Sequence, residues 1–113
     1  MLINLTPHSV TIRKPDDTVI TIPPSGSIAR VESFEEPRPD TEGIPTIRRM
    51  WGGINLGTTI EAGNIYIVST LVLDAVQDET DPLAKVLVAP DTGQTAVRDD
   101  RGQIVEVKRF ITL

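Results

Sequence analysis

Two short apolar runs, separated by a helix-like stretch, organise the middle of the chain. Residues 65–68 and 86–89 are rich in β-branched side chains and end in polar or turn-forming residues, which is typical of strands buried on both faces. Between them the sequence predicts a short helix whose apolar face is formed by Leu71, Val72, Ala75 and Val76. The sixteen-residue connection 69–84 is long enough for a crossover, so we expect the two strands to run parallel.

The segments on either side of this unit alternate between apolar and polar residues, as half-buried strands do. The expected strands are 1–5, 9–13, 18–22, 27–32, 45–51, 95–98 and 104–110. Turn residues at 14–17 and a loop at 99–102 that ends in glycine predict two hairpins. The sequence therefore predicts a mainly β, α+β fold: a small mixed sheet or a distorted barrel of about eight strands with one short helix.

Chain length and local composition bear on domain organisation. A chain of 113 residues is expected to form a single domain, 1–113. Residues 33–43 differ from the rest, because four acidic residues are interleaved with Pro37 and Pro39 and few apolar side chains remain. We expect this segment to be an exposed, mobile loop.

Overall composition excludes several classes of function. A formal net charge of −5 argues against general nucleic-acid binding, which needs a basic surface to displace counterions. The absence of cysteine excludes disulfides and thiolate metal sites. The first residues lack a signal-peptide pattern and no later stretch approaches ~20 apolar residues, so we expect a cytoplasmic protein with no membrane partner.

A candidate binding edge follows from the expected parallel pair, because the carboxyl ends of parallel strands open onto one edge of a sheet. Ser69 and Thr70 follow the first strand, and Asp91, Thr92 and Gly93 follow the second. Ligands sit at this edge in open α/β sheets, and the start of a helix presents amides to an anion. Local roles remain open for the same residues: a hydroxyl can cap the helix, and Asp91 can form an Asx-turn.

Three further side chains complete the candidate ligand-binding set: His8, Arg48 and Arg98. The planar donor fork of arginine matches phosphate or carboxylate, although pairing with nearby acids is the alternative for each arginine. For His8 the alternative is a ring bonded to nearby backbone. A lone histidine has no second histidine to share a metal with, and no nucleophile elbow, phosphate loop or HExxH occurs. We expect no catalytic residue, no metal site and no cofactor.

Four blocks of sequence resemble a family of uncharacterised small bacteriophage and prophage proteins. They are NLTPH at 4–8, PPSG at 23–26, YIVS at 66–69 and APDTG at 89–93, and the likeness covers nearly the whole chain. The resemblance implies a phage setting, and therefore the host cell cytoplasm, but no reaction. Small phage proteins of this size are often virion parts or inhibitors of host defence, including oligomeric sponges that bind a nucleotide-derived host signal without cleaving it.

Three hypotheses follow. The first is a non-enzymatic anti-defence protein, a sponge that sequesters a small phosphorylated nucleotide-like ligand, which includes cyclic forms. It would act as a homodimer or higher oligomer, and the eight residues named above would bind the ligand. The second is a structural or protein-interaction module, such as a virion accessory protein or a direct inhibitor of a host protein, that docks through 33–43 or an exposed sheet edge. The third, a hydrolase that uses His8 and an aspartate, has the least support.

Overall fold

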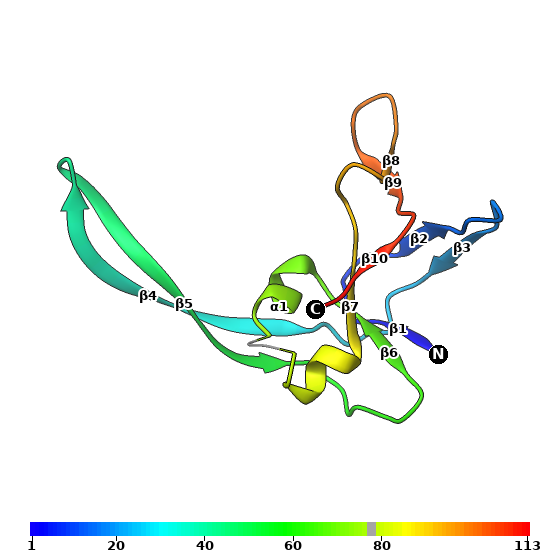
Figure 1. The fold of residues 1–113 in the computed structure, drawn as a ribbon, viewed down its shortest axis with the longest axis horizontal. Helices are drawn as coiled ribbons and strands as arrows, with labels where there is room; N and C mark the ends of the chain where they lie inside the picture. Colours follow the sequence, from blue (N-terminus) through cyan, green and yellow to red (C-terminus); the bar gives the residue numbers. More distant parts are fainter. Residues whose placement is uncertain (77–78) are drawn as a thin grey trace.

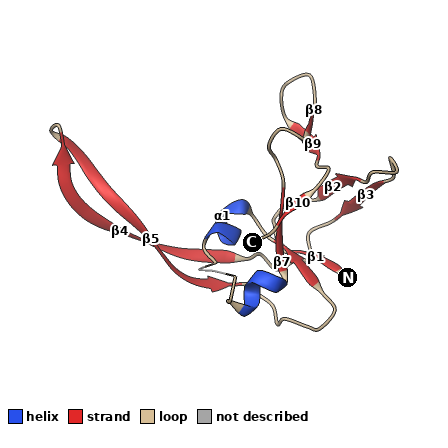
Figure 2. Ribbon diagram, in the orientation of Figure 1, coloured by secondary structure: helices blue, strands red, loops and turns tan. Residues whose placement is uncertain are grey.

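The computed structural model describes residues 1–76 and 79–113, and within them the chain is mainly β with one short α-helix (Figures 1 and 2). Four strands form the central sheet in the order β1–β6–β7–β10. Their bounds are β1 Leu2–Asn4, β6 Ile65–Ile67, β7 Leu87–Pro90 and β10 Phe110–Ile111. The described strands lie in several small sheets and none closes into a barrel, so the mixed sheet is the predicted alternative that the structure shows.

The two apolar runs of the centre form the parallel pair that the sequence predicts. Tyr66 pairs with Leu87 and Ile67 with Val88, and β1 extends the parallel part of the sheet on the other side of β6. The crossover between β6 and β7 contains α1 (Thr70–Asp74) and the 3₁₀-helix η1 (Pro82–Lys85). Residues 77 and 78 of this connection lie outside the described residues.

Both faces of the central sheet are buried, because successive side chains of a strand point to opposite sides. Tyr66, Val68, Leu87 and Ala89 belong to one core cluster, which α1 covers with Val72 and Leu73. Ile67 and Val88 belong to the other, which the β2–β3 hairpin covers with Val10 and Ile12. The predicted double burial of these strands is confirmed.

Hairpins supply most of the remaining structure. The two shorter ones are β2 (Val10–Arg13) with β3 (Val19–Ile22), and β8 (Val97–Arg98) with β9 (Ile104–Glu106). Both were predicted, and Gly102 in the second turn has the positive φ expected there, 80°. The expected strand 104–110 is divided, since β9 ends at Glu106 and β10 begins at Phe110 and pairs with β7 instead.

The segment 33–43, expected to be a mobile loop, is the outer part of a long strand followed by a tight turn. β4 (Arg30–Thr41) pairs antiparallel with β5 (Ile44–Asn55), and the ladder includes Pro37 opposite Ile47. The prediction of a loop was wrong because two prolines and four acids resemble loop composition, although prolines are tolerated at the edge of a sheet. The expected exposure of the segment is confirmed.

We call residues 30–55 the arm, because this ribbon leaves the rest of the chain, the body, and extends away from it (Figure 1). Its base packs against the body, where Val31 and Ile54 contact the first core cluster. The radius of gyration is 16.6 Å, against about 13 Å for a compact domain of this length. The arm accounts for this difference, since it sets the 53 Å long axis of the molecule.

Candidate functional site

At the carboxyl end of β6, Ser69 caps the short helix that follows. Its backbone is extended, and its Oγ accepts a hydrogen bond from the Val72 amide at 3.3 Å. Thr70 is the first residue of α1 and is exposed. The capping role left open by the sequence is therefore the one observed, and the serine hydroxyl already accepts from a first-turn amide.

At the carboxyl end of β7, the buried carboxylate of Asp91 is held by its own turn and by Arg109, the residue before β10. Its Oδ1 accepts from the Gly93 amide at 2.9 Å, which is the Asx-turn that the sequence allowed. Its Oδ2 accepts from the Arg109 guanidinium. The hydrogen bond from Arg109, followed by that from the Gly93 amide, holds the pKa of Asp91 below its usual range. The role of Asp91 is thus to fasten the turn.

Arg98 on β8 is also occupied by the chain itself. Its Nη1 donates to the Gly102 carbonyl at 2.7 Å, and its Nη2 approaches the Thr92 carbonyl at 3.4 Å. The guanidinium therefore joins the β8–β9 turn to the turn after β7. Arg98 lies beside Thr92, as expected from their closeness in sequence, but part of its donor fork is already used.

Two of the eight predicted residues, His8 and Thr92, line one pocket of about 340 Å³. It lies between the start of β2, the end of β7 and β9, and it is lined by His8, Ser9, Val10, Thr11, Pro90, Thr92, Ile104, Val105, Glu106 and Val107. Asn4 positions the histidine, because its Nδ2 donates to the His8 carbonyl at 2.8 Å. Within the described chain the ring itself has no hydrogen-bond partner, so its expected bond to backbone is not formed.

Glu106 gives this pocket its only lining carboxylate, and that carboxylate is already paired. Arg13 Nε donates to Glu106 Oε2 at 2.8 Å and Arg13 Nη2 donates to Oε1 at 2.9 Å. The bidentate pair ties β2 to β9 and raises the pKa of Arg13, chiefly through the hydrogen bond and charge of Glu106. The lining of the pocket thus combines apolar side chains with hydroxyls, an imidazole and an acid paired with Arg13.

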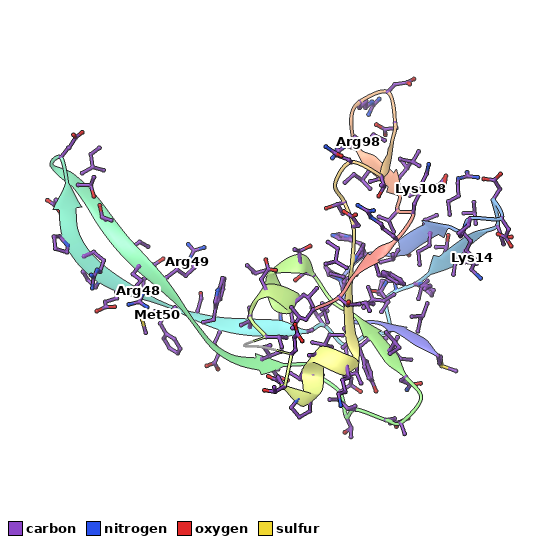
Figure 3. All side chains as sticks on the ribbon, in the orientation of Figure 1. Lys14, Arg48, Arg49, Met50, Arg98 and Lys108 are labelled. Atoms are coloured by element: carbon purple, nitrogen blue, oxygen red, sulfur yellow. The ribbon has the colours of Figure 1, made fainter. Side chains whose placement is uncertain are left out.

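Arg48 lies away from this pocket, on the arm (Figure 3). There it lines a second pocket of about 470 Å³ with its neighbours on β5 and the end of the α1 segment: Arg49, Met50, Trp51, Gly52, Asp74, Ala75 and Val76. Ser69, Thr70 and Gly93 line neither pocket. The parallel strands are present, but the structure does not gather the eight predicted residues into one site.

Sequence reasoning missed two features that the structure makes prominent. The first is Asn4, a buried side chain that donates to the His8 and Ile22 carbonyls and accepts from the Thr6 amide. Its polar character at the end of an apolar strand was the available signal. The second is the arm, for which the signal was Glu42-Gly43: both have positive φ, 50° and 81°, as a two-residue hairpin turn requires.

Comparisons with protein-family models, with curated proteins and with solved structures find no match to this chain. Among residues 1–76 and 79–113, no group of three or more histidine or acidic side chains is placed to hold a metal ion. The helices of the described residues are all too short to cross a membrane. The site must therefore be interpreted from its own geometry.

Proposed function

We propose that the protein is a protein-interaction module and that the arm is the element with which it docks on another protein chain. The observation that supports this is the exposure of large apolar side chains along a ribbon that leaves the body. Phe34 is 54% exposed, Ile47 50% and Trp51 39%, and Ile44 and Met50 are also exposed. Clustered apolar side chains at a surface indicate an interaction site, whereas single ones do not.

The stability of the ribbon supports the same conclusion. A two-stranded hairpin alone is marginally stable in water, because it lacks a third strand or a packed face. Among the described residues, the arm beyond Val31 and Ile54 contributes no side chain to either core cluster, and its ion pairs are weak: Glu35 lies 4.0 Å from Arg49, and Glu36 lies 3.8 Å from Arg38. Exposed pairs of this kind contribute at most about 1 kcal/mol. A docked partner would supply the missing packing.

This proposal agrees with part of what the sequence resemblance implies. Among phage proteins of this size, a virion accessory protein or a direct inhibitor of a host protein works by contact with another chain. The arm carries apolar side chains on both of its faces and charged side chains between them (Figure 3). Such a surface is suited to a specific protein contact, in which apolar groups supply affinity and charges fix the orientation.

The direct test is a photo-crosslinking amino acid placed at Ile47, with the same group at Thr21 on the exposed side of β3 as the matched control. Irradiation of the purified protein, and of cells that express it, should give a discrete protein adduct from position 47 and none from position 21. Equal labelling from the two positions, or none from position 47, would contradict the docking role of the arm.

A second candidate function is the non-enzymatic sequestration of a small phosphorylated nucleotide-like ligand, and the pocket at His8 and Thr92 supports it. A volume of about 340 Å³ lies within the range of roughly 300–1,000 Å³ typical of ligand sites. His8, Ser9 and Thr92 would bind polar groups, and Arg98 beside Thr92 would offset phosphate charge.

Titration calorimetry against a panel of linear and cyclic nucleotides tests this candidate. Binding that His8→Ala and Thr92→Ala both weaken by tenfold or more, with unaltered ligand recovered after heating the complex, would support sequestration. Consumption of the ligand would instead support the hydrolase. Thr58→Ala, an exposed residue between β5 and β6 that does not line the pocket, is the control that should leave binding unchanged.

A further inference from the structure

We propose that the partner of the arm is a second copy of this chain, joined to it edge to edge through β5. The two arms would form a four-stranded antiparallel sheet in the order β4–β5–β5–β4, with Ile47 of each copy on the twofold axis. This inference rests on the proposed docking role of the arm, and it specifies the occupant, the edge and the register.

The outer edge of β4 is blocked against strand pairing. Pro37 and Pro39 lack an amide hydrogen, and prolines in sheets stand where the nitrogen faces away from the partner strand. Glu35, Glu36 and Asp40 add like charges along the same strand. Prolines and charges are the means by which proteins keep an edge strand unpaired.

The outer edge of β5 has fewer obstacles to strand pairing than that of β4. Between Ile44 and Trp51 it contains no acidic residue, and its one proline, Pro45, whose nitrogen also faces outward because it lies two residues before Ile47, stands next to the turn. Successive residue pairs in an antiparallel ladder alternate: in one pair the amides point toward the partner strand, and in the next they point away from it. Because the Pro37 nitrogen faces outward, its partner Ile47 directs its amide outward on the β5 side, and Arg49, two residues further on, does the same. β5 thus offers outward donors at Ile47 and Arg49, whereas the corresponding positions 37 and 39 of β4 are prolines.

The sequence of β5 fixes the register, because its apolar residues are symmetric about Ile47. Ile44 precedes it by three residues and Met50 follows it by three. With the two copies of Ile47 opposite each other, Ile44 of each copy faces Met50 of the other. Ile44, Ile47 and Met50 then each face an apolar residue of the other copy, and such cross-strand pairs stabilise a sheet.

Charge favours this register over its neighbours. With Ile47 at the centre, Arg48 lies opposite Thr46 of the second copy and Arg49 opposite Pro45. Moving the centre by one residue, to Arg48, would keep the alternation of the amides but place the two copies of Arg48 directly opposite each other, and like charges in that position destabilise a sheet. Arg48 has no ion-pair partner among the described residues that would offset such repulsion.

The resulting sheet has continuous apolar rows on both faces. Pro37 and Ile47 of one copy would continue into Ile47 and Pro37 of the other, and Phe34 and Met50 would continue into Ile44. Each ribbon would gain the additional strands that an independent sheet needs. Since both outer edges would be the blocked β4 strands, assembly would stop at the dimer instead of forming a filament.

The join is short, so association should depend on concentration. The seven paired residues 44–50 span about 24 Å, and one edge contact buries less than the roughly 800 Å² per partner of a standard interface. We therefore expect monomer in dilute solution and dimer at higher concentration. Ile47→Lys should weaken the association tenfold or more, whereas Val19→Lys, on the exposed side of β3, should leave it unchanged.

Single cysteines test the register directly, because the chain has none of its own. Opposite residues of a hydrogen-bonded pair have Cα atoms about 5.5 Å apart, inside the range of roughly 4.4–6.8 Å that a disulfide bridges. Under mild oxidation Ile47→Cys should form a covalent dimer. Thr46→Cys alone and Arg48→Cys alone should form little, but a mixture of the two should form the heterodimer.

The outcomes separate this inference from the proposed function. If Thr46→Cys cross-links as readily as Ile47→Cys, or if no variant forms a dimer at high concentration, pairing through β5 is wrong. A photo-crosslinked adduct with a different protein at position 47 would then leave the docking role of the arm intact. If position 47 gives no adduct of any kind, both the pairing through β5 and the docking role of the arm are wrong.

Discussion

Arg109 and Asp91 join the turn after β7 to the approach to β10 by two contacts. The Arg109 guanidinium donates to Asp91 Oδ2, and the Asp91 amide donates to the Arg109 carbonyl at 3.0 Å. The carboxylate is buried, and its other oxygen accepts from the Gly93 amide. Asp91, which the sequence placed in a ligand site, therefore fastens the end of β7 to the residue before β10.

The first prediction concerns the pH dependence of stability. Because the folded-state pKa of Asp91 is depressed, by Arg109 first and the Gly93 amide second, its contribution is fully present above the ordinary carboxyl pKa of 3.8. It is lost as pH falls through the depressed value. The melting temperature of the wild type should therefore fall more steeply below about pH 5 than that of Asp91→Asn. Parallel curves from pH 7 to pH 2 would contradict the role of this ion pair.

The second prediction concerns Asn4, which is 1% exposed. Asn4→Ala would remove the donor to the His8 and Ile22 carbonyls and the acceptor of the Thr6 amide, and would leave the His8 carbonyl only the Thr6 hydroxyl, at a cost of about 3 kcal/mol in the free energy of unfolding. Asn4→Asp keeps the shape and the acceptor but removes both donors, so it should also destabilise. Urea unfolding measures both changes; a loss below about 1 kcal/mol for Asn4→Ala would show that water replaces these bonds.

The third prediction is that the body folds without the outer arm. The first core cluster consists of body residues together with the base of the arm, and the second consists of body residues alone. Replacing residues 33–51 by Asn-Gly keeps Val31 and Ile54 and should change the melting temperature by less than about 4 °C. The deletion should also abolish any self-association. Unfolding of the shortened chain would mean that the arm contributes to the core instead of serving as an appendage.

The fourth prediction concerns the turn at the tip of the arm. Glu42 has a φ of 50°, a conformation in which asparagine is more favourable than glutamate. Glu42→Asn should therefore slow hydrogen exchange along β4 and β5. Gly43→Ala meets no atom within 4 Å but must adopt a φ of 81°, so it should speed exchange by about tenfold, corresponding to roughly 1–2 kcal/mol. Equal rates in both variants would show that the tip does not limit arm stability.

The body of the fold was accessible from sequence because its signals are local. Runs such as 65–68 combine β-branched residues with clear boundaries, and Ser69 stands where a helix cap is needed. The arm was not accessible, since the pairing of Pro37 with Ile47 depends on partners across a turn whose Glu-Gly signature is weaker than Asn-Gly.

The candidate site could be predicted only residue by residue. Ser69 and Asp91 do stand at the ends of parallel strands, but each is used by its own segment. Whether side chains at one edge converge depends on what lies between them, and the pattern of a single chain does not contain that information. His8 and Thr92 line the same pocket because the start of β2 lies beside the end of β7, and the sequence does not reveal this tertiary arrangement.

Hydrogen exchange at the Ile47 and Arg49 amides tests the docking role of the arm most directly. Rates would be compared in dilute protein, in concentrated protein and in any complex isolated through a cross-link at position 47. Exchange should be fast in dilute protein and slower by tenfold or more when the arm is occupied, while amides of β3 stay unchanged. Equal rates for Ile47 and Arg49 in all three samples would contradict the assignment of the arm as an interaction surface.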